Sequence, residues 1–275
     1  MAGRSGSKRR EPLAPALPDV TVAGVADDVV DEAQLSALHF DRVDLSGFEV
    51  ADVDIEECRF ASVDASGGHW ERVTVANCRV DGGSLANLQV RGGNLRRCEV
   101  TDNRMTGLQW TDGVVRDVRF TRCRGDLAGF RFSRFTHVVF ADCRLASIDF
   151  TGADLSGVAF VDCDLTGARL NEATMTGATL TNCRLEDVSG IGALRGATVS
   201  GVDMMSLAFQ LAADAGITLV PLSRDGQEYD GVGECEEAVS LGWDGRQFGF
   251  AEDEFAVGPF QADSAGDDLK GRVAG

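Results

Sequence analysis

Cysteine is the side chain of this sequence with the widest chemical range, since a thiolate can attack an electrophile, pair with a second thiol or bind a metal. The chain has eight cysteines, and the sequence intervals between the first seven are 20, 20, 25, 20, 20 and 20. A zinc site would show closely spaced CxxC pairs, and a secreted disulfide framework would be short and dense in cysteine. Neither pattern is present in the sequence.

The regular spacing favours a structural role for these thiols. If one turn of a coil has the same length as this interval, the cysteines stack above one another and fill a slot too narrow for leucine. We therefore predict a ladder of reduced, buried thiols, with redox chemistry and metal binding as the alternatives. The seven positions are Cys58, Cys78, Cys98, Cys123, Cys143, Cys163 and Cys183.

The remaining residues that could carry chemistry are scattered. The three histidines, His39, His69 and His137, have no cysteine or carboxylate at the spacing of a metal site or catalytic triad. The glycine pairs at 67–68 and 92–93 lie outside any phosphate-binding motif. The sequence therefore predicts no catalytic residue, no cofactor and no metal site, so we do not expect an enzyme.

The elements that hold the cysteines follow a second period, of five residues. In FADCRLASIDFTGADLSGVAF, residues 140–160, a large apolar residue recurs at Phe140, Leu145, Phe150, Leu155 and Phe160. This period is neither the two of a strand nor the 3.6 of a helix. It extends over 30 central positions from residue 40 to 185, of which 28 are Leu, Phe, Val, Ile, Met or Trp; the exceptions are Ala65 and Gly125.

Two of every five positions are suited to a core. The slot two residues before each central residue holds Cys, Ala, Gly or Val in most repeats, and the other three positions are mostly polar. A repeat of this kind cannot bury its apolar side alone, so stacked repeats must share one core. The pattern predicts a four-sided coil with four repeats per turn and a large side chain inside each wall.

The stretch FTGADLSGVAFVDCDLTGARLNEATMTGATL, residues 150–180, resembles the pentapeptide-repeat proteins, and the resemblance covers about residues 36–195. It implies an all-β solenoid, the right-handed quadrilateral β-helix of pentapeptide repeats. With strand-like spacing of about 4.8 Å between layers, seven to eight coils would make a rod on the order of 35 Å long.

We predict four segments. Residues 1–34 are expected to be disordered, because a basic cluster is followed by Pro12, Pro15 and Pro18. Residues 35–200 form the β-helix, and residues 201–220 form a capping or dimerisation helix with a short extended segment. Residues 221–275 are expected to be a mostly disordered acidic tail, since residues 201–275 carry 15 acids and only 4 bases. A short aromatic piece of the tail docking elsewhere is the alternative.

Helical spacing appears after the repeats. Asp203 is a candidate N-cap, and Gly216 suits a C-terminal stop. The candidate cap or dimer residues are Met204, Leu207, Ala208 and Leu211. The helix resembles the C-terminal closure of pentapeptide-repeat proteins, which pairs two subunits in the quinolone-resistance members. This resemblance implies a homodimer, and a monomer whose helix covers its own last coil is the alternative.

The pattern slips between Cys98 and Cys123, where the cysteine spacing is 25. Either the cysteine column moves to the adjacent wall or one repeat is extruded as a loop. Nearby, apolar side chains occupy outward slots within an arginine-rich stretch, which predicts a partner-binding patch, although they could also fold against the coil. The candidate patch is Arg122, Arg124, Leu127, Phe132 and Arg134.

Charge and hydropathy limit the partners. The net charge of −18 disfavours nucleic acid, and no apolar run is long enough to cross a membrane, so we expect a cytoplasmic, soluble protein. We predict a non-catalytic scaffold that binds an unknown protein through its outer faces. The alternative, implied by the resemblance, is a DNA mimic that binds DNA gyrase and protects it from quinolones. Against mimicry, residues 91–134 carry 10 bases and 5 acids, which interrupts a phosphate-like field.

Overall fold

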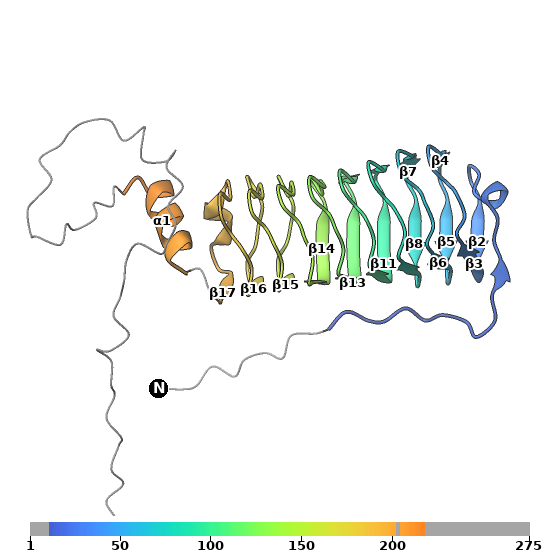
Figure 1. Ribbon diagram of the computed structural model, residues 1–275, viewed down its shortest axis with the longest axis horizontal. Coiled ribbons are helices and arrows are strands. Elements are labelled where there is room, and N and C mark those ends of the chain that lie inside the picture. The colour runs from blue at the N-terminus through green and yellow to red at the C-terminus, as the bar shows by residue number, and fades with distance from the viewer. Residues whose placement is uncertain (1–10, 202–203, 218–275) are drawn as a thin grey trace, which may run out of the picture. The chain divides into compact units, whose positions relative to one another are not determined.

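The computed structural model describes residues 11–201 and 204–217, and within them the chain forms a parallel β-solenoid of about nine turns (Figure 1). Successive coils pair with an offset of four repeats through most of the stack, as in Phe40↔Phe60 and Phe120↔Phe140. At the two ends the offset is 16 residues (Val22↔Leu38) and 19 residues (Leu180↔Val199). The predicted coil of four five-residue repeats is therefore confirmed. The coil count exceeds the predicted seven to eight because residues before 35 add to the stack.

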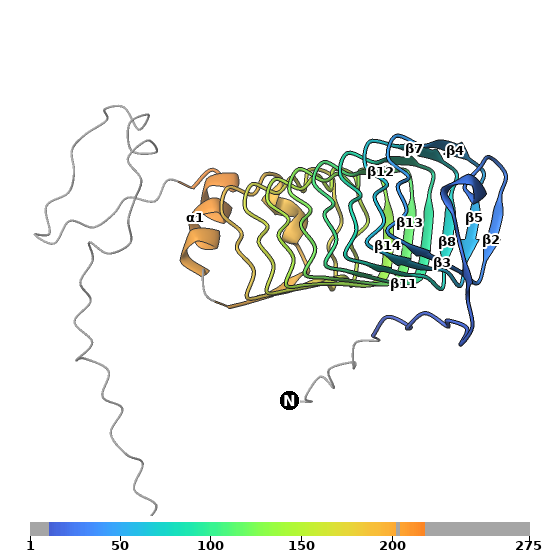
Figure 2. The same cartoon turned by 45° about the vertical axis from the view of Figure 1, so that its right-hand side comes forward.

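Each coil has four walls, named here A to D in chain order. Walls A and B carry most of the strands, and in three coils one long strand turns the corner between them (Figure 2). Wall A comprises β2 (Gln34–Ser36), β5 (Asp54–Glu56), β8 (Thr74–Ala76) and the first halves of β11 (Asn94–Thr101), β13 (Val114–Thr121) and β14 (Arg134–Ala141). Wall B comprises β1 (Val22–Ala23), β3 (Leu38–Asp41), β6 (Arg59–Ala61), β9 (Arg79–Asp81), the second halves of the long strands, β15 (Ala159–Val161), β16 (Thr179–Thr181) and β17 (Thr198–Ser200).

Walls C and D complete the square. Wall C is held by single parallel bridges that join each coil to the next from Asp44 to Arg184. Wall D comprises β4 (Glu49–Ala51), β7 (His69–Glu71), β10 (Gln89–Arg91) and β12 (Gln109–Thr111), and bridges continue it from Gly129 to Ser189. Wall and coil number together therefore fix the place of every outward side chain.

The five-residue repeat produces flat walls because the chain turns at each corner. The residue two places after a central residue commonly adopts a left-handed backbone, as at Asp52 (φ 58°), Asn77 (φ 52°) and Gly107 (φ 69°). Glycine, asparagine and aspartate enter this region at the lowest cost. The polar corner residues of the sequence thus set the turns.

Backbone hydrogen bonds join each coil to both neighbours. The amide of Leu165 donates to Arg184 O (3.0 Å) in the next coil, and the amide of Asp164 donates to Cys143 O (3.0 Å) in the previous one. Most of the stability of one coil therefore depends on the coils directly above and below it.

The core is formed by the central residues, as predicted. Phe140, Leu145, Phe150 and Leu155 have no exposed surface. Phenylalanines of wall B stack in register, with ring centroids 4.7 Å apart for Phe120 and Phe140 and 5.2 Å apart for Phe140 and Phe160. The interior is therefore a continuous apolar column.

The cysteines lie in two stacked columns, one at each end of wall B. Cys58, Cys78 and Cys98 lie at the corner of walls A and B, and the column from Cys123 to Cys183 lies at the corner of walls B and C. The register Arg104↔Arg124 keeps the offset of one full coil across the slip. The cysteine column therefore changes corner, and the extruded-loop alternative is wrong.

The N-terminal segment differs from the prediction of disorder over residues 1–34. Residues 11–34 contain β1, which pairs with β3, and a 3₁₀ helix, η1 (Ala26–Asp28). The difference arises because β1 extends wall B by one strand, which covers the open edge of the first coil. The part of this prediction that concerns residues 1–10 lies outside the described residues.

The C-terminal end is closed by η2 (Ile191–Leu194) and α1 (Met204–Asp214). Leu207 is buried, the Gln210 Nε2 donates to Leu185 O (2.9 Å), and the Val188 amide donates to Gln210 Oε1 (3.2 Å). One glutamine thus bridges the two backbone groups that bond to each other directly in earlier wall C turns, as Ala168 N does to Leu165 O (3.0 Å). Gly216 (φ 71°) follows the helix end, as predicted, whereas Asp203 and the predicted tail lie outside the described residues.

Candidate functional site

The thiol columns are set up for packing. Each sulfur lies near backbone carbonyl oxygens, for example Cys143 Sγ at 3.7 Å from Phe120 O and 3.2 Å from Ala141 O. The neighbouring Cys123 thiol, together with burial, raises the pKa of Cys143 to about 12. All seven cysteines of the described residues are free, and six of them are buried. A protonated, buried thiol is a poor nucleophile.

The three histidines stay apart in the structure. His39, His69 and His137 lie on walls B, D and the corner of A and B, in different coils. His137 Nδ1 lies 3.3 Å from Asp117 Oδ1, the one carboxylate contact of a histidine among the described residues. Within the same residues, no group of three or more His, Cys, Asp or Glu side chains is arranged to hold a metal ion.

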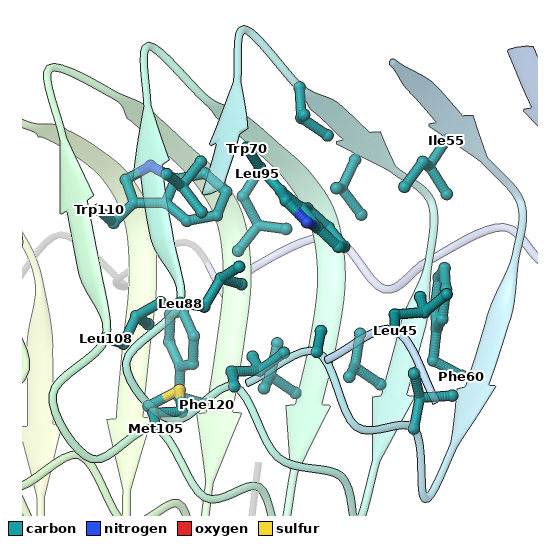
Figure 3. Close-up of a pocket in the computed structure, with 18 of the residues that line it drawn as sticks. Leu45, Ile55, Phe60, Trp70, Leu88, Leu95, Met105, Leu108, Trp110 and Phe120 are labelled. Atoms are coloured by element: carbon teal, nitrogen blue, oxygen red, sulfur yellow. The ribbon is translucent and has the colours of Figure 1, made fainter. Parts of the chain in front are cut away.

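A cavity of about 80 Å³ lies inside the first half of the coil stack (Figure 3). Its lining is apolar, and Trp70 and Trp110 contribute indoles whose buried Nε1 atoms have no hydrogen-bond partner among the described residues. Ala65, the small exception among the apolar central residues, also lines the cavity. The cavity is therefore a loosely filled part of the core.

The five residues of the predicted patch are spread around one coil. Arg122 lies at the corner of walls B and C, Arg124 on wall C, Leu127 at the corner of C and D, Phe132 at the corner of D and A, and Arg134 on wall A. Arg122 is also held by Asp102, with Nε and Nη2 at 2.8 and 2.7 Å from its carboxylate oxygens. The structure thus does not form one patch from all five.

Two members of the set do share one wall. Leu127 and Phe132 border wall D of the same coil and are 63% and 53% exposed. Both adopt a left-handed backbone, with φ of 58° and 55°. Among the described residues they are the only large apolar residues with positive φ, a conformation that costs a bulky side chain free energy. Positive φ is common at the corners of this fold, and these two corners differ from the others in holding large, exposed apolar side chains.

The wall between these two side chains is flat. Its outward residues are Gly129, over which the Gln109 side chain lies, and Arg131, whose Cζ is 5.5 Å from the Phe132 ring centroid. The ring also covers Gly152 of the next coil, where a Cβ would come within 2.4 Å of it. Leu127, Gly129, Arg131 and Phe132 are called the wall D platform below.

Arginines flank the platform on both adjacent walls. On wall C, Arg104, Arg124 and Arg144 lie on successive coils, and Arg144 pairs with Asp126 at 3.0 Å. On wall A, Arg96 lies next to Arg116. Between residues 96 and 134, five arginines form no ion pair within the described part of the chain: Arg96, Arg97, Arg104, Arg124 and Arg134. These cations are available to an anionic partner.

The charge along the outer walls changes sign. Wall C has Asp44 and Asp64 on its first coils, then the three arginines, then Asp164. Wall A likewise begins with Asp54 and Glu56 before its arginines. A continuous negative stripe is therefore absent from walls A and C over the described coils.

The predicted cap residues on α1 differ in exposure. Leu207 packs on the last coil, whereas Ala208 and Leu211 are exposed, and the side chain of Met204 lies outside the described part. Phe209 and Ile217 add 51% and 57% exposed side chains that the sequence analysis missed. In the described residues, no helix is long and apolar enough to cross a membrane.

The sequence analysis also missed Arg131 and Gly129. The signal was present, because five-residue counting puts residues 127 to 132 on one wall and spreads 122 to 134 over several. The five-residue count alone therefore places the residues of the platform on one wall.

Comparisons with known proteins agree with the repeat. Residues 126–167 and 148–187 match the family model for pentapeptide repeats, in eight copies. The search of curated proteins gave no match. Among solved structures, full-length QnrB1, a plasmid-mediated fluoroquinolone resistance protein, is 18% identical, with a TM-score of 0.34, over 72% of this chain and 99% of that one. HetL, a pentapeptide repeat protein involved in heterocyst differentiation regulation in the cyanobacterium Nostoc, is 16% identical, with a TM-score of 0.28, over 70% and 91%.

Proposed function

We propose that this pentapeptide-repeat protein is a non-catalytic scaffold that binds a protein partner through the wall D platform and the arginines beside it. One observation carries the proposal: Leu127 and Phe132 keep large, exposed apolar side chains at backbone positions where the other coils hold mostly polar residues or glycine. Aromatic and arginine side chains around a flat surface are the composition of interface hot spots.

The charges beside the platform suggest the chemistry of the partner. Arg124 on one side and Arg134 on the other have no ion pair within the described residues, while Arg131 lies 3.9 Å from Asp149. A partner with an apolar centre and carboxylates on either side would complement this surface. The rim charges would mainly set the association rate and its dependence on salt.

A photo-crosslinking amino acid tests the proposal in cells of the source organism. Placed at Leu127 or Phe132, it should give a discrete protein adduct that the same amino acid at Thr181, on wall B, does not give. The adduct should disappear when Arg131→Ala is added. Identical adducts from all three positions, or none from the platform, would contradict the proposal.

DNA gyrase is the second candidate partner. Acidic side chains on the first coils, such as Asp44, Asp54 and Asp64, support a phosphate-like surface there. The arginines of the middle coils interrupt it, which is why we rank a scaffold first. Titration into purified gyrase with relaxed plasmid separates the two: inhibition of supercoiling or protection from quinolone at micromolar protein would favour the DNA mimic.

The exposed side of α1 supports a homodimer as part of the same function. Phe209 is 51% exposed on the face of α1 opposite Leu207, and Leu211, one turn after Leu207, is still 42% exposed. Sedimentation of the full chain should show a dimer that the Leu211→Glu substitution dissociates. A monomer at all concentrations would contradict the homodimer. The free, buried cysteines further support a reducing, cytoplasmic location.

A further inference from the structure

Residues 11–18 lie along the edge between walls A and B (Figures 1 and 2). Glu11 pairs with Arg119, and the Leu13 amide donates to Asp117 Oδ1 at 3.4 Å. The Ala16 amide donates to Asn77 Oδ1 at 3.5 Å, and Arg59 Nη2 donates to Pro18 O at 3.0 Å. The segment, called the strap here, thus runs past four coils in the direction opposite to their order.

The strap and the edge share a repeat distance. Leu13 and Ala16 are three residues apart, which is one turn of a polyproline II helix, about 9.3 Å. Their acceptors, Asp117 and Asn77, are two coils apart, about 9.6 Å at the usual spacing between strands. One turn of a polyproline II segment therefore spans two coils, which lets the amides of Leu13 and Ala16 reach Asp117 and Asn77.

The prolines fall on the side of the strap that faces the coils. Pro12, Pro15 and Pro18 are half-buried, as is Leu17, whereas Leu13, Ala14 and Ala16 are exposed. Proline suits this side because it has no amide hydrogen to lose on burial, and its fixed φ lowers the entropy cost of docking. All three prolines of the strap therefore lie on its less exposed side.

The edge is built to receive such a segment. Asp117 is 3% exposed and Asn77 is 7% exposed, although both are corner residues, and the corner residue of the coil between them, Arg97, is exposed. His137 lies on the coil after that of Asp117, and its Nδ1 is 3.3 Å from Asp117 Oδ1. The polar side chains of this edge therefore continue onto that coil. With the strap in place, the Oδ1 atoms of Asp117 and Asn77 both accept strap amides, and Asp117 Oδ2 also lies 3.4 Å from Arg116 Nε.

We propose that the edge between walls A and B is a recognition groove for polyproline II segments with proline at every third residue. The strap is its internal occupant, and a proline-rich segment of a partner protein, with an acid directly before the first proline, displaces it. This surface is separate from the wall D platform, so either function can fail without the other.

Fluorescence anisotropy with a labelled peptide of residues 11–20, EPLAPALPDV, tests the groove. The peptide is titrated into the full chain and into a full-length variant in which Pro12, Pro15 and Pro18 are replaced by glycine, which loosens the strap. We expect at least about tenfold tighter binding by the variant, because the tethered strap competes at high effective concentration. A peptide with proline at every fourth residue should not bind either protein.

Variants of the groove show where the peptide binds. Added to the glycine variant, Asp117→Ala should weaken binding at least about tenfold by removing an acceptor, whereas Asp142→Ala, at the corner of walls B and C, should leave it unchanged. Since Asp117 is buried, Arg119→Glu is a second, more exposed probe: it should weaken binding of the peptide and strengthen binding of one with Lys in place of Glu11.

Three results would overturn the proposal. One is no saturable binding by the glycine variant, and another is equal binding by the Asp117→Ala and Asp142→Ala variants. The third is a dimer of the full chain, seen by sedimentation, that the peptide dissociates, because the groove would then belong to a second copy of the chain.

Discussion

The two halves of the coil stack use one repeat but fill their interiors differently. Between residues 45 and 110 most central residues are Val, Leu or Ala, and the cavity of about 80 Å³ lies among them. Between residues 120 and 160, six of the nine central residues are phenylalanine and interlock, with Phe130 and Phe150 5.8 Å apart. The backbone period thus sets where a side chain points, and side-chain volume sets how tightly a coil packs.

The tryptophans show how the first half partly compensates. The Trp110 ring lies where Gly93 and Gly113 have no side chain, since a Cβ on Gly113 would come 2.1 Å from its Nε1. A Cβ on Gly68 would come 3.2 Å from Trp70 Nε1 and closer still, 2.7 Å, to Phe48 O. Gly93 and Gly113 therefore leave the space that the Trp110 ring occupies.

The largest effect should come from the tightly packed half. Phe140→Ala should reduce the free energy of unfolding by about 3–5 kcal/mol, because it removes a fully buried ring with stacked neighbours. Phe60→Ala, next to the cavity and 8% exposed, should cost less. Urea denaturation of both variants measures the difference, and equal losses would contradict the contrast between the halves.

A clash with tryptophan should have the next largest effect. Gly113→Ala puts a methyl group into the Trp110 indole and should cost about 1–3 kcal/mol by overpacking. The double variant Gly113→Ala with Trp110→Leu should recover part of this loss, since the ring is gone. A double-mutant cycle from thermal unfolding gives the coupling, and strict additivity would show that the two sites are independent.

High pH should weaken the cysteine columns. The pKa of Cys143 and that of Cys163 are raised to about 12, chiefly by the neighbouring thiol and burial, so their stability contribution is complete below the unfolded pKa near 9 and is lost as pH rises toward 12. We expect a loss of about 1 kcal/mol at pH 10 for each of these two thiols. The contact with Cys143 lowers the pKa of Cys123, so that thiol does not add to the loss. Denaturation at pH 8 and pH 10 measures this loss of stability. The Cys143→Ser variant should lack the part of the loss that Cys143 causes, and its new hydroxyl corresponds to the one that Ser133 has at another corner.

Filling the cavity should stabilise the first half modestly. Ala65→Val adds two methyl groups beside the empty volume and should raise the free energy of unfolding by about 0.5–1 kcal/mol. The matched change in the second half, Gly125→Ala, places a Cβ 3.0 Å from the Leu145 side chain and should not stabilise. A rise in melting temperature for both variants would show that the halves have equal room.

The smallest effect on stability should come from the wall D platform, because the side chains proposed to bind a partner lie at backbone positions that disfavour them. Leu127→Asn and Phe132→Asn replace strained apolar residues with the type found at the Asn77 and Asn182 corners, so stability should stay level or rise by about 0.5 kcal/mol per site. Thermal unfolding checks this. Loss of stability would mean that these side chains belong to the fold.

The sequence predicted the interior better than the exterior. The central residues, the coil of four repeats and the C-terminal helix follow from local periods, which a single sequence displays. The wall of each outward residue also follows from counting, as the platform shows. The position of residues 11–18 does not follow from counting. Leu13 contacts Asp117 across 104 positions of sequence, and no repeat in the sequence predicts that contact.

The move of the cysteine column from one corner to the next shows what an insertion of a single repeat means in this architecture. Four repeats make one full turn, so adding or removing a whole coil leaves every later residue on the same wall. Adding or removing one repeat moves every later residue to the adjacent wall. The platform and the strap edge therefore keep a fixed angle to each other around the coil axis. Inserting whole coils between them would increase their distance along the axis, whereas inserting one to three repeats would also rotate one relative to the other.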